Sequence, residues 1–160
     1  MPVKTARSLL SKFREGKNSL KLPIDPRELA KIEGVRVIAD PNLDNDNVSG
    51  EYMYEGWLPT IKYNPRDSVK RQRFTIAHEL GHHVLKHGHS FRDNKKNFTL
   101  HNFDCREVAA NKFAAELLMP ADAISVLINQ RNIKSVVELA KIFDVSVAAM
   151  KYRLENLGFL

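Results

Sequence analysis

The sequence predicts an α+β fold in which a small twisted β-sheet packs on one long helix and a helical hairpin follows at the C-terminus. Short runs rich in β-branched residues, separated by glycine and polar turns, occupy residues 35–63. A proline-free segment with apolar side chains three and four positions apart follows at residues 69–86. Two capped helical segments joined by a short turn lie beyond residue 130.

The composition is that of an ordinary globular protein, with 28% charged and 43% hydrophobic residues. A chain of 160 residues can bury one real core. We therefore expect a main domain at residues 1–130 and a helix-turn-helix-like segment at residues 131–160 packed on it. The single cysteine, Cys105, excludes an intramolecular disulfide and suits a reducing cytosol. No stretch approaches the roughly 20 apolar residues of a membrane span, so a cytoplasmic protein is predicted.

Two helices are expected before the sheet. Residues 1–20 carry basic side chains and a short apolar face, which favours an amphipathic helix packed on the domain over one lying on a membrane surface. Asp25 as N-cap, Pro26 in the first turn and Glu28 in the capping-box position begin a second helix. Gly34 is expected to end it.

Three strands are expected at residues 35–39, 48–54 and 58–63, with a polar turn after the first and a turn near Gly56 between the others. Pro59 within the last strand indicates an edge strand.

An exposed edge near a catalytic centre could bind an extended substrate peptide through its backbone. Trp57, Ile61 and Tyr63 are therefore candidate substrate-binding residues. The alternative is that the aromatic residues simply fill the core.

The long helix at residues 69–86 contains His78-Glu79-Leu80-Gly81-His82, an H-E-x-x-H pattern. Histidines four apart lie on one face, so both imidazoles can reach one metal ion. Glu79 is turned by about 100° from His78, which places its carboxylate beside the ion as a general base. The pattern predicts a zinc hydrolase if a third ligand exists, and Gly81 leaves room for another backbone to approach.

The third ligand is expected on a helix that begins after Asp104. Glu107 and Asn111 share a face there, so Glu107 can complete a His-His-Glu site and Asn111 can orient a ligating histidine. One alternative is that Glu107 serves only in a capping box with Asp104, and another is that Glu116 is the ligand. We favour Glu107, because the cap is worth only about 1 kcal/mol and the metal site requires a third ligand.

These residues resemble the ImmA/IrrE metallopeptidases, which are small zincin-like proteins. The resemblance rests on residues 73–82, on Glu107 to Asn111, and on residues 113–120, with weaker support from residues 24–26, 48–50 and 59–64. It implies a zincin-like fold, zinc at His78, His82 and Glu107, and Glu79 as general base. It also implies cleavage of a helix-turn-helix repressor of the XRE type, or of an antitoxin.

Residues 88–103 are polar with scattered aromatic side chains and are too long for a simple connection, so they are expected to form a wall of the cleft. His101 is a candidate for stabilising the oxyanion, with solvent exposure as the alternative. Neither His83 nor His87 shows the spacing of a second metal site.

The last two helices are expected at about residues 136–143 and 147–157, around a turn at Asp144. Their spacing is similar to that of a DNA-binding helix-turn-helix. A net charge of +6 leaves DNA binding open, yet Lys151 and Arg153 are the only two cations on the expected recognition helix. A hairpin that completes the core is therefore favoured. The competing function is a non-catalytic regulator with structural zinc that binds DNA or a repressor through these helices.

Overall fold

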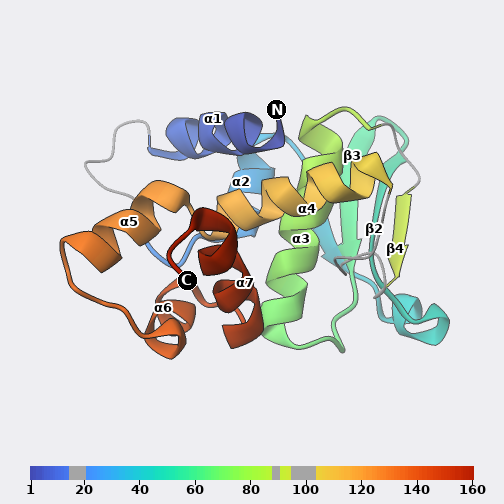
Figure 1. The fold of residues 1–160 in the computed structure, drawn as a ribbon. Coiled ribbons are helices and arrows are strands. Elements are labelled where there is room, and N and C mark those ends of the chain that lie inside the picture. The colour runs from blue at the N-terminus through green and yellow to red at the C-terminus, as the bar shows by residue number, and fades with distance from the viewer. Residues whose placement is uncertain (15–20, 88–90, 95–103) are drawn as a thin grey trace.

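The computed structural model describes residues 1–14, 21–87, 91–94 and 104–160, and it confirms the α+β fold (Figure 1). The elements follow in the order α1 (Pro2–Arg14), α2 (Pro26–Ile32), β1 (Arg36–Ala39), the 3-10 helix η1 (Pro41–Asp46), β2 (Val48–Glu55), β3 (Leu58–Tyr63), α3 (Val69–Val84), β4 (Phe91–Asn94), α4 (Cys105–Leu118), α5 (Ala121–Asn129), α6 (Val136–Phe143) and α7 (Val147–Leu157).

The sheet has four strands in the order β1-β3-β2-β4. β2 and β3 form an antiparallel hairpin around Gly56, whose φ of 64° is in the left-handed region that glycine favours. β1 pairs with β3 in parallel, and β4 pairs with β2 in antiparallel fashion. The edges of the sheet are thus β1 and β4.

The prediction that the strand at residues 58–63 forms an edge is wrong, because β3 lies between β1 and β2. Pro59 is tolerated in this inner strand because β1 pairs only with Thr60 to Tyr63. The proline therefore lies beyond the end of β1, where no parallel neighbour needs its missing N–H.

Helix α3 is the centre of the molecule. It contacts β2 and β3 on one side and α4 on the other, so that the sheet, α3 and α4 form successive layers (Figure 1). Ala77 and Leu80 of the expected apolar stripe are fully buried, while its other members, Phe74 and Val84, are partly buried against the core. Ser68 caps the helix by accepting a hydrogen bond from the backbone N–H of Arg71 at 3.2 Å.

The two N-terminal helices cover this arrangement. α1 packs on α4 through a face that buries Ala6, Leu9 and Leu10, which confirms the amphipathic helix. Asp25 caps α2 with its side chain, and Gly34, at φ 71°, follows its end as predicted. No helix among the described residues combines the length and apolar character needed to cross a membrane.

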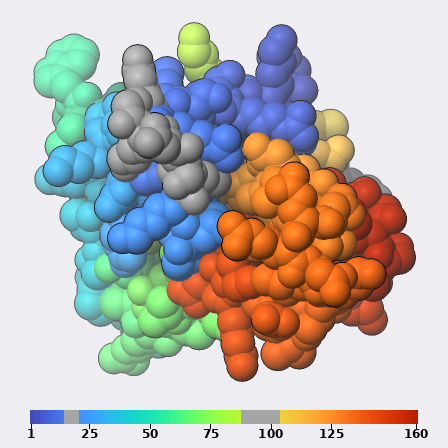
Figure 2. All heavy atoms as spheres, turned by 90° about the vertical axis from the view of Figure 1, so that its left-hand side faces the viewer, coloured from blue at the N-terminus to red at the C-terminus, as the bar shows by residue number. Residues whose placement is uncertain are grey.

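The C-terminal hairpin of α6 and α7 shares the core of the rest of the chain. Leu139, Phe143 and Met150 belong to the same buried cluster as the core residues of α3 and α4. Asp144 makes the turn with φ 52°, a conformation that aspartate tolerates better than most residues. In Figure 2 the orange-to-red atoms of the C-terminal helices lie directly against the blue N-terminal segment. The division at residue 130 remains a prediction.

Two buried arginines attach this hairpin to the other helices. Arg73 of α3 donates hydrogen bonds to the carbonyl oxygens of Phe143 and Asp144 at 3.2 and 3.1 Å, at the end of α6. Arg153 of α7 donates to the carbonyl oxygen of Met119 at 3.1 Å and forms an ion pair with Glu116 of α4. Since Arg153 is only 8% exposed, it is not available as a DNA-contacting cation, which agrees with the favoured hairpin that completes the core; Lys151 is exposed.

Candidate metal centre

Two histidines of α3 point toward α4 from the buried face of the helix. His78 and His82 are both fully buried, and their Nε2 atoms lie 3.2 Å apart. The spacing of four residues places one ring a single turn above the other, as the sequence predicts. Their imidazoles meet at 84° with centroids 4.8 Å apart. Both rings therefore direct their Nε2 atoms to the same place.

Glu107 of α4 brings a carboxylate to that place. Its Oε2 lies 3.0 Å from Nε2 of His78, and its Oε1 lies 3.1 Å from Nε2 of His82. The ligand atoms of the three side chains all lie within 4.8 Å of one another, which is the arrangement of a group able to hold a metal ion. Asp104 caps α4 through its own side chain, while the carboxylate of Glu107 faces the histidines.

Glycine at position 81 allows the close approach of α3 to α4 that this convergence needs. A Cβ atom at Gly81 would lie 3.0 Å from Cδ1 of Phe113 and 3.3 Å from Cα of Ala110. Larger side chains would push the two helices apart. The expectation that Gly81 admits another backbone is confirmed.

Each histidine also has a contact on its other ring nitrogen. Nδ1 of His78 lies 2.8 Å from Oδ1 of Asn111, the residue predicted to orient a ligand. Nδ1 of His82 lies 2.9 Å from Nδ1 of His87, a residue that sequence reasoning set aside. Burial, with the nearby His82 as a smaller cause, lowers the pKa of His87 from its usual value.

Glu79 lies on a different side of α3, against the sheet. It is fully buried, and a Cβ atom at Gly50 of β2 would lie 3.2 Å from its Oε1 and 2.3 Å from Cγ2 of Thr75. Glycine at position 50 is thus required for β2 to pass this close to α3. Glu79 is not one of the three grouped ligand-type side chains, and its place beside a metal ion stays a prediction.

Glu116, the alternative third ligand, serves a different purpose. Its buried carboxylate pairs with Arg153 and, at 3.1 Å, with Nε of Arg7. It therefore joins α4 to α7 and α1. Cys105 is exposed.

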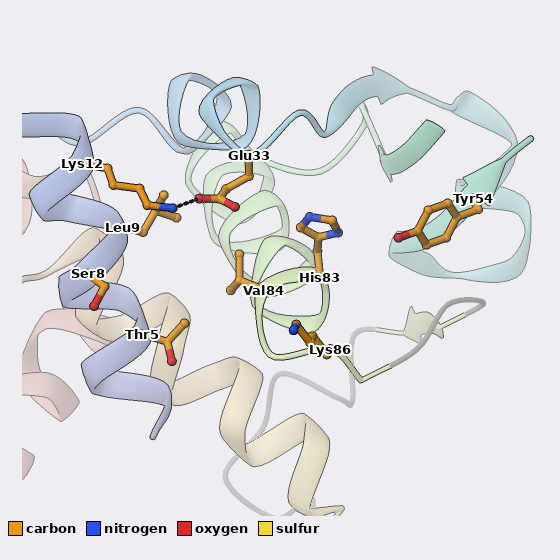
Figure 3. A pocket seen from close by; sticks show the side chains of 9 residues that line it. All are labelled: Thr5, Ser8, Leu9, Lys12, Glu33, Tyr54, His83, Val84 and Lys86. Carbon is orange, nitrogen blue, oxygen red and sulfur yellow. Dashed lines mark hydrogen bonds and ion pairs between the residues drawn. The ribbon is translucent and has the colours of Figure 1, made fainter. Parts of the chain in front are cut away.

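A separate hollow of about 470 Å³ lies where α1 faces the end of α3 (Figure 3). It is lined mainly by polar side chains, among them Lys12 and Glu33, which form an ion pair at 3.4 Å. His83 lines it from α3, and its Nδ1 lies 2.7 Å from the hydroxyl of Tyr52. Burial lowers the pKa of His83 and raises that of Tyr52. This hollow and the candidate metal centre use different faces of α3.

The candidate substrate-binding residues have different environments. Ile61 is fully buried in the inner strand β3. The guanidinium carbon of Arg27 lies over the ring of Tyr63, 5.0 Å from the centroid of that ring. Trp57, in the hairpin turn, is 98% exposed, and a contact with substrate there stays a prediction. His101 lies outside the described residues, as does most of the expected cleft wall.

An α+β domain that gathers an H-E-x-x-H helix and a glutamate of another helix at one buried centre defines a metallopeptidase-like class of protein. The chain matches the family model Peptidase_M78, the IrrE N-terminal-like domain, over residues 30–155, and it belongs to that family. The predicted resemblance to the ImmA/IrrE proteins, with their zincin-like fold, is thereby confirmed.

The chain is also similar to the Uncharacterized immunity region protein 2 of Bacillus phage phi105. The two are 36% identical over 101 residues, which is 63% of this chain and 62% of the relative. The match thus spans less than two thirds of the relative's length.

Proposed function

We propose that this protein is a zinc-dependent metalloendopeptidase with His78, His82 and Glu107 as the metal ligands. The observation that carries the proposal is the convergence of two Nε2 atoms and a carboxylate within 4.8 Å at a buried point. Two imidazoles and a carboxylate are a donor set found in catalytic zinc sites, in which a fourth position is left for water or substrate. Membership of the peptidase family supports the same assignment.

The donor set itself fits a divalent cation. The Nε2 atoms of His78 and His82 and the carboxylate oxygens of Glu107 lie 3.0 to 3.2 Å from one another, and all three side chains are buried. A cation bound between them would offset the cost of burying the Glu107 carboxylate. When bound, zinc acts as a Lewis acid that lowers the pKa of water and stabilises the charge developing on the substrate carbonyl oxygen.

The proposed general base is Glu79. Its position one residue after His78 turns it away from the three ligands, and its burial removes it from bulk water. In the proposed reaction its carboxylate accepts the proton of the attacking water and passes that proton to the leaving amine of the peptide bond. Asn111 holds His78 through the ring nitrogen that does not face Glu107.

The proposed substrate is a helix-turn-helix repressor or an antitoxin, cleaved in the cytoplasm. This part rests on the family and on the relative's name, which places that relative in a phage immunity region. Arg153, one of the two cations of the final helix, is buried in an ion pair, so the observations favour a protein substrate over DNA.

The test is a cleavage assay on purified candidate repressors and antitoxins, with zinc content measured in parallel. Glu79→Gln should retain zinc and lose about 10²-fold or more in cleavage rate, because the base is gone while the ligands remain. Glu28→Gln, at an exposed position on α2, is the matched control and should cleave like the wild type. A Glu79→Gln protein with wild-type activity would refute the mechanism.

A further inference from the structure

The second ring nitrogen of His82 has a partner that spacing alone did not predict. Its Nδ1 lies 2.9 Å from Nδ1 of His87, and the two ring centroids are 5.2 Å apart. The opposite nitrogen, Nε2, faces Oε1 of Glu107 at 3.1 Å. His87 therefore lies on the far side of the His82 ring from the proposed metal position.

The turn that ends α3 brings His87 to this place. Lys86 adopts the left-handed conformation, with φ 58°. Its N–H donates to the carbonyl oxygen of His83 at 3.1 Å, and the N–H of His87 donates to that of His82 at 3.0 Å. This pair of hydrogen bonds is the usual helix-ending motif in which glycine is preferred at the left-handed position. The turn folds the chain back, so that a residue five positions after His82 reaches its ring.

We propose that His87 is a positioning residue that holds His82 in the tautomer and orientation needed to bind the metal. The inference rests on the proposed metal centre. A neutral imidazole carries one N–H, so a ring that binds a metal through Nε2 must carry its proton on Nδ1. Nδ1–H of His82 then donates to Nδ1 of His87, whose own proton is on Nε2.

The other histidine ligand has the equivalent arrangement. Nδ1 of His78 lies 2.8 Å from the side-chain oxygen of Asn111, and an amide oxygen can only accept. His78 and His82 thus each have an acceptor placed at Nδ1, supplied by α4 in one case and by the end of α3 in the other. Partners of this kind fix the ring of a metal-binding histidine and raise its basicity.

Direct binding of the metal by His87 does not fit the geometry. Its Nδ1 lies 2.9 Å from the nitrogen of His82 that faces away from Glu107. It is also not in the group formed by His78, His82 and Glu107. If His87 only closed the turn, replacing its side chain would leave zinc affinity unchanged, because the hydrogen bond from its backbone N–H to the carbonyl oxygen of His82 would remain.

The test compares zinc affinity among three variants of the full chain by competition with a chromophoric chelator. His87→Leu removes the acceptor, and we expect zinc binding to weaken about 10-fold or more. His87→Asn places an amide oxygen near the position of Nδ1, so we expect it to restore most of the affinity. His83→Leu is the matched control: it removes the 2.7 Å contact with Tyr52 on another face of α3 and should leave zinc affinity unchanged.

Unfolding followed by circular dichroism separates a loss of zinc affinity from a loss of fold. Wild-type affinity in His87→Leu would overturn the proposal. Equal weakening in His87→Leu and His87→Asn, both still folded, would also overturn it, because the hydrogen bond would then not be the cause. Failure of the wild-type protein to bind zinc would instead overturn the metal centre on which the inference rests.

Discussion

Replacing Arg153 with methionine removes one half of the buried ion pair that joins α7 to α4. The side chain of Glu116 is 2% exposed and that of Arg153 is 10% exposed. Among the described residues, Arg153→Met leaves the buried Glu116 carboxylate with Arg7 as its remaining charged partner, and the side chain of Arg7 is 61% exposed. The carbonyl oxygen of Met119 also loses the hydrogen bond that it accepts at 3.1 Å.

The expected cost is large compared with the whole stability of the domain. Removing one partner of a buried pair costs about 3–5 kcal/mol, because the other charge stays in the core. Arg7 compensates in part, so we expect about 3 kcal/mol, against a total of roughly 5–15 kcal/mol for a typical domain. With a urea slope of about 2 kcal/mol per molar, the unfolding midpoint should fall by about 1.5 M.

The assay is urea unfolding followed by far-ultraviolet circular dichroism, because the single tryptophan, Trp57, is 98% exposed and reports weakly on the core. Replacing both Glu116 and Arg153 with apolar residues should recover most of the loss, since no buried charge is then left unpaired and Arg7, which loses its partner, is 61% exposed. Lys151→Met, on the exposed face of the same helix, should stay within about 0.5 kcal/mol. A loss below about 1 kcal/mol in Arg153→Met would refute the buried-pair reasoning.

Three further changes test the packing around the centre. Gly50→Ala should lower stability and any cleavage activity, because its Cβ would lie 2.3 Å from Cγ2 of Thr75 and 3.2 Å from Oε1 of Glu79; adding Thr75→Ser, which removes that methyl group, should restore both in part, because the contact with Glu79 remains. Gly81→Ala gains about 1 kcal/mol of helix propensity, but the new methyl group pushes α3 away from Ala110 of α4 at a cost of about 1–3 kcal/mol. We therefore expect a net loss of stability in urea unfolding. A gain in stability would show that the two helices can move apart without cost. Asp104→Ala should lower the free energy of unfolding by about 1 kcal/mol, because α4 loses its N-cap, while the zinc content should stay unchanged. A loss of zinc would mean that the cap also positions Glu107.

Local signals predicted most of what positions the site. The spacing of His78 and His82 determines that they share a helix face, and caps such as Asp25 and Asp104 mark where helices begin. These features depend on neighbours within one or two turns, so the sequence displays them directly.

The misread features depend on residues far apart in the chain. A proline excludes an inner strand only where a neighbouring strand would need its missing N–H. β1 is short and ends before Pro59, and the length of β1 could not be read from the sequence. The ion pair of Arg153 could not be read from its neighbours, because its partner, Glu116, lies 37 positions away. His87 was overlooked because Lys86, instead of glycine, occupies the left-handed position, so nothing marks the turn.

The most direct test of the proposed metal centre is the zinc content of the purified protein beside that of Glu107→Ala, measured by mass spectrometry of the metal. We expect about one zinc ion per wild-type chain and a large loss in Glu107→Ala, since two histidines alone leave the site without its third protein ligand. Glu28→Gln should keep the wild-type content, as an exposed glutamate outside the centre. Full zinc content in a folded Glu107→Ala protein would contradict the account.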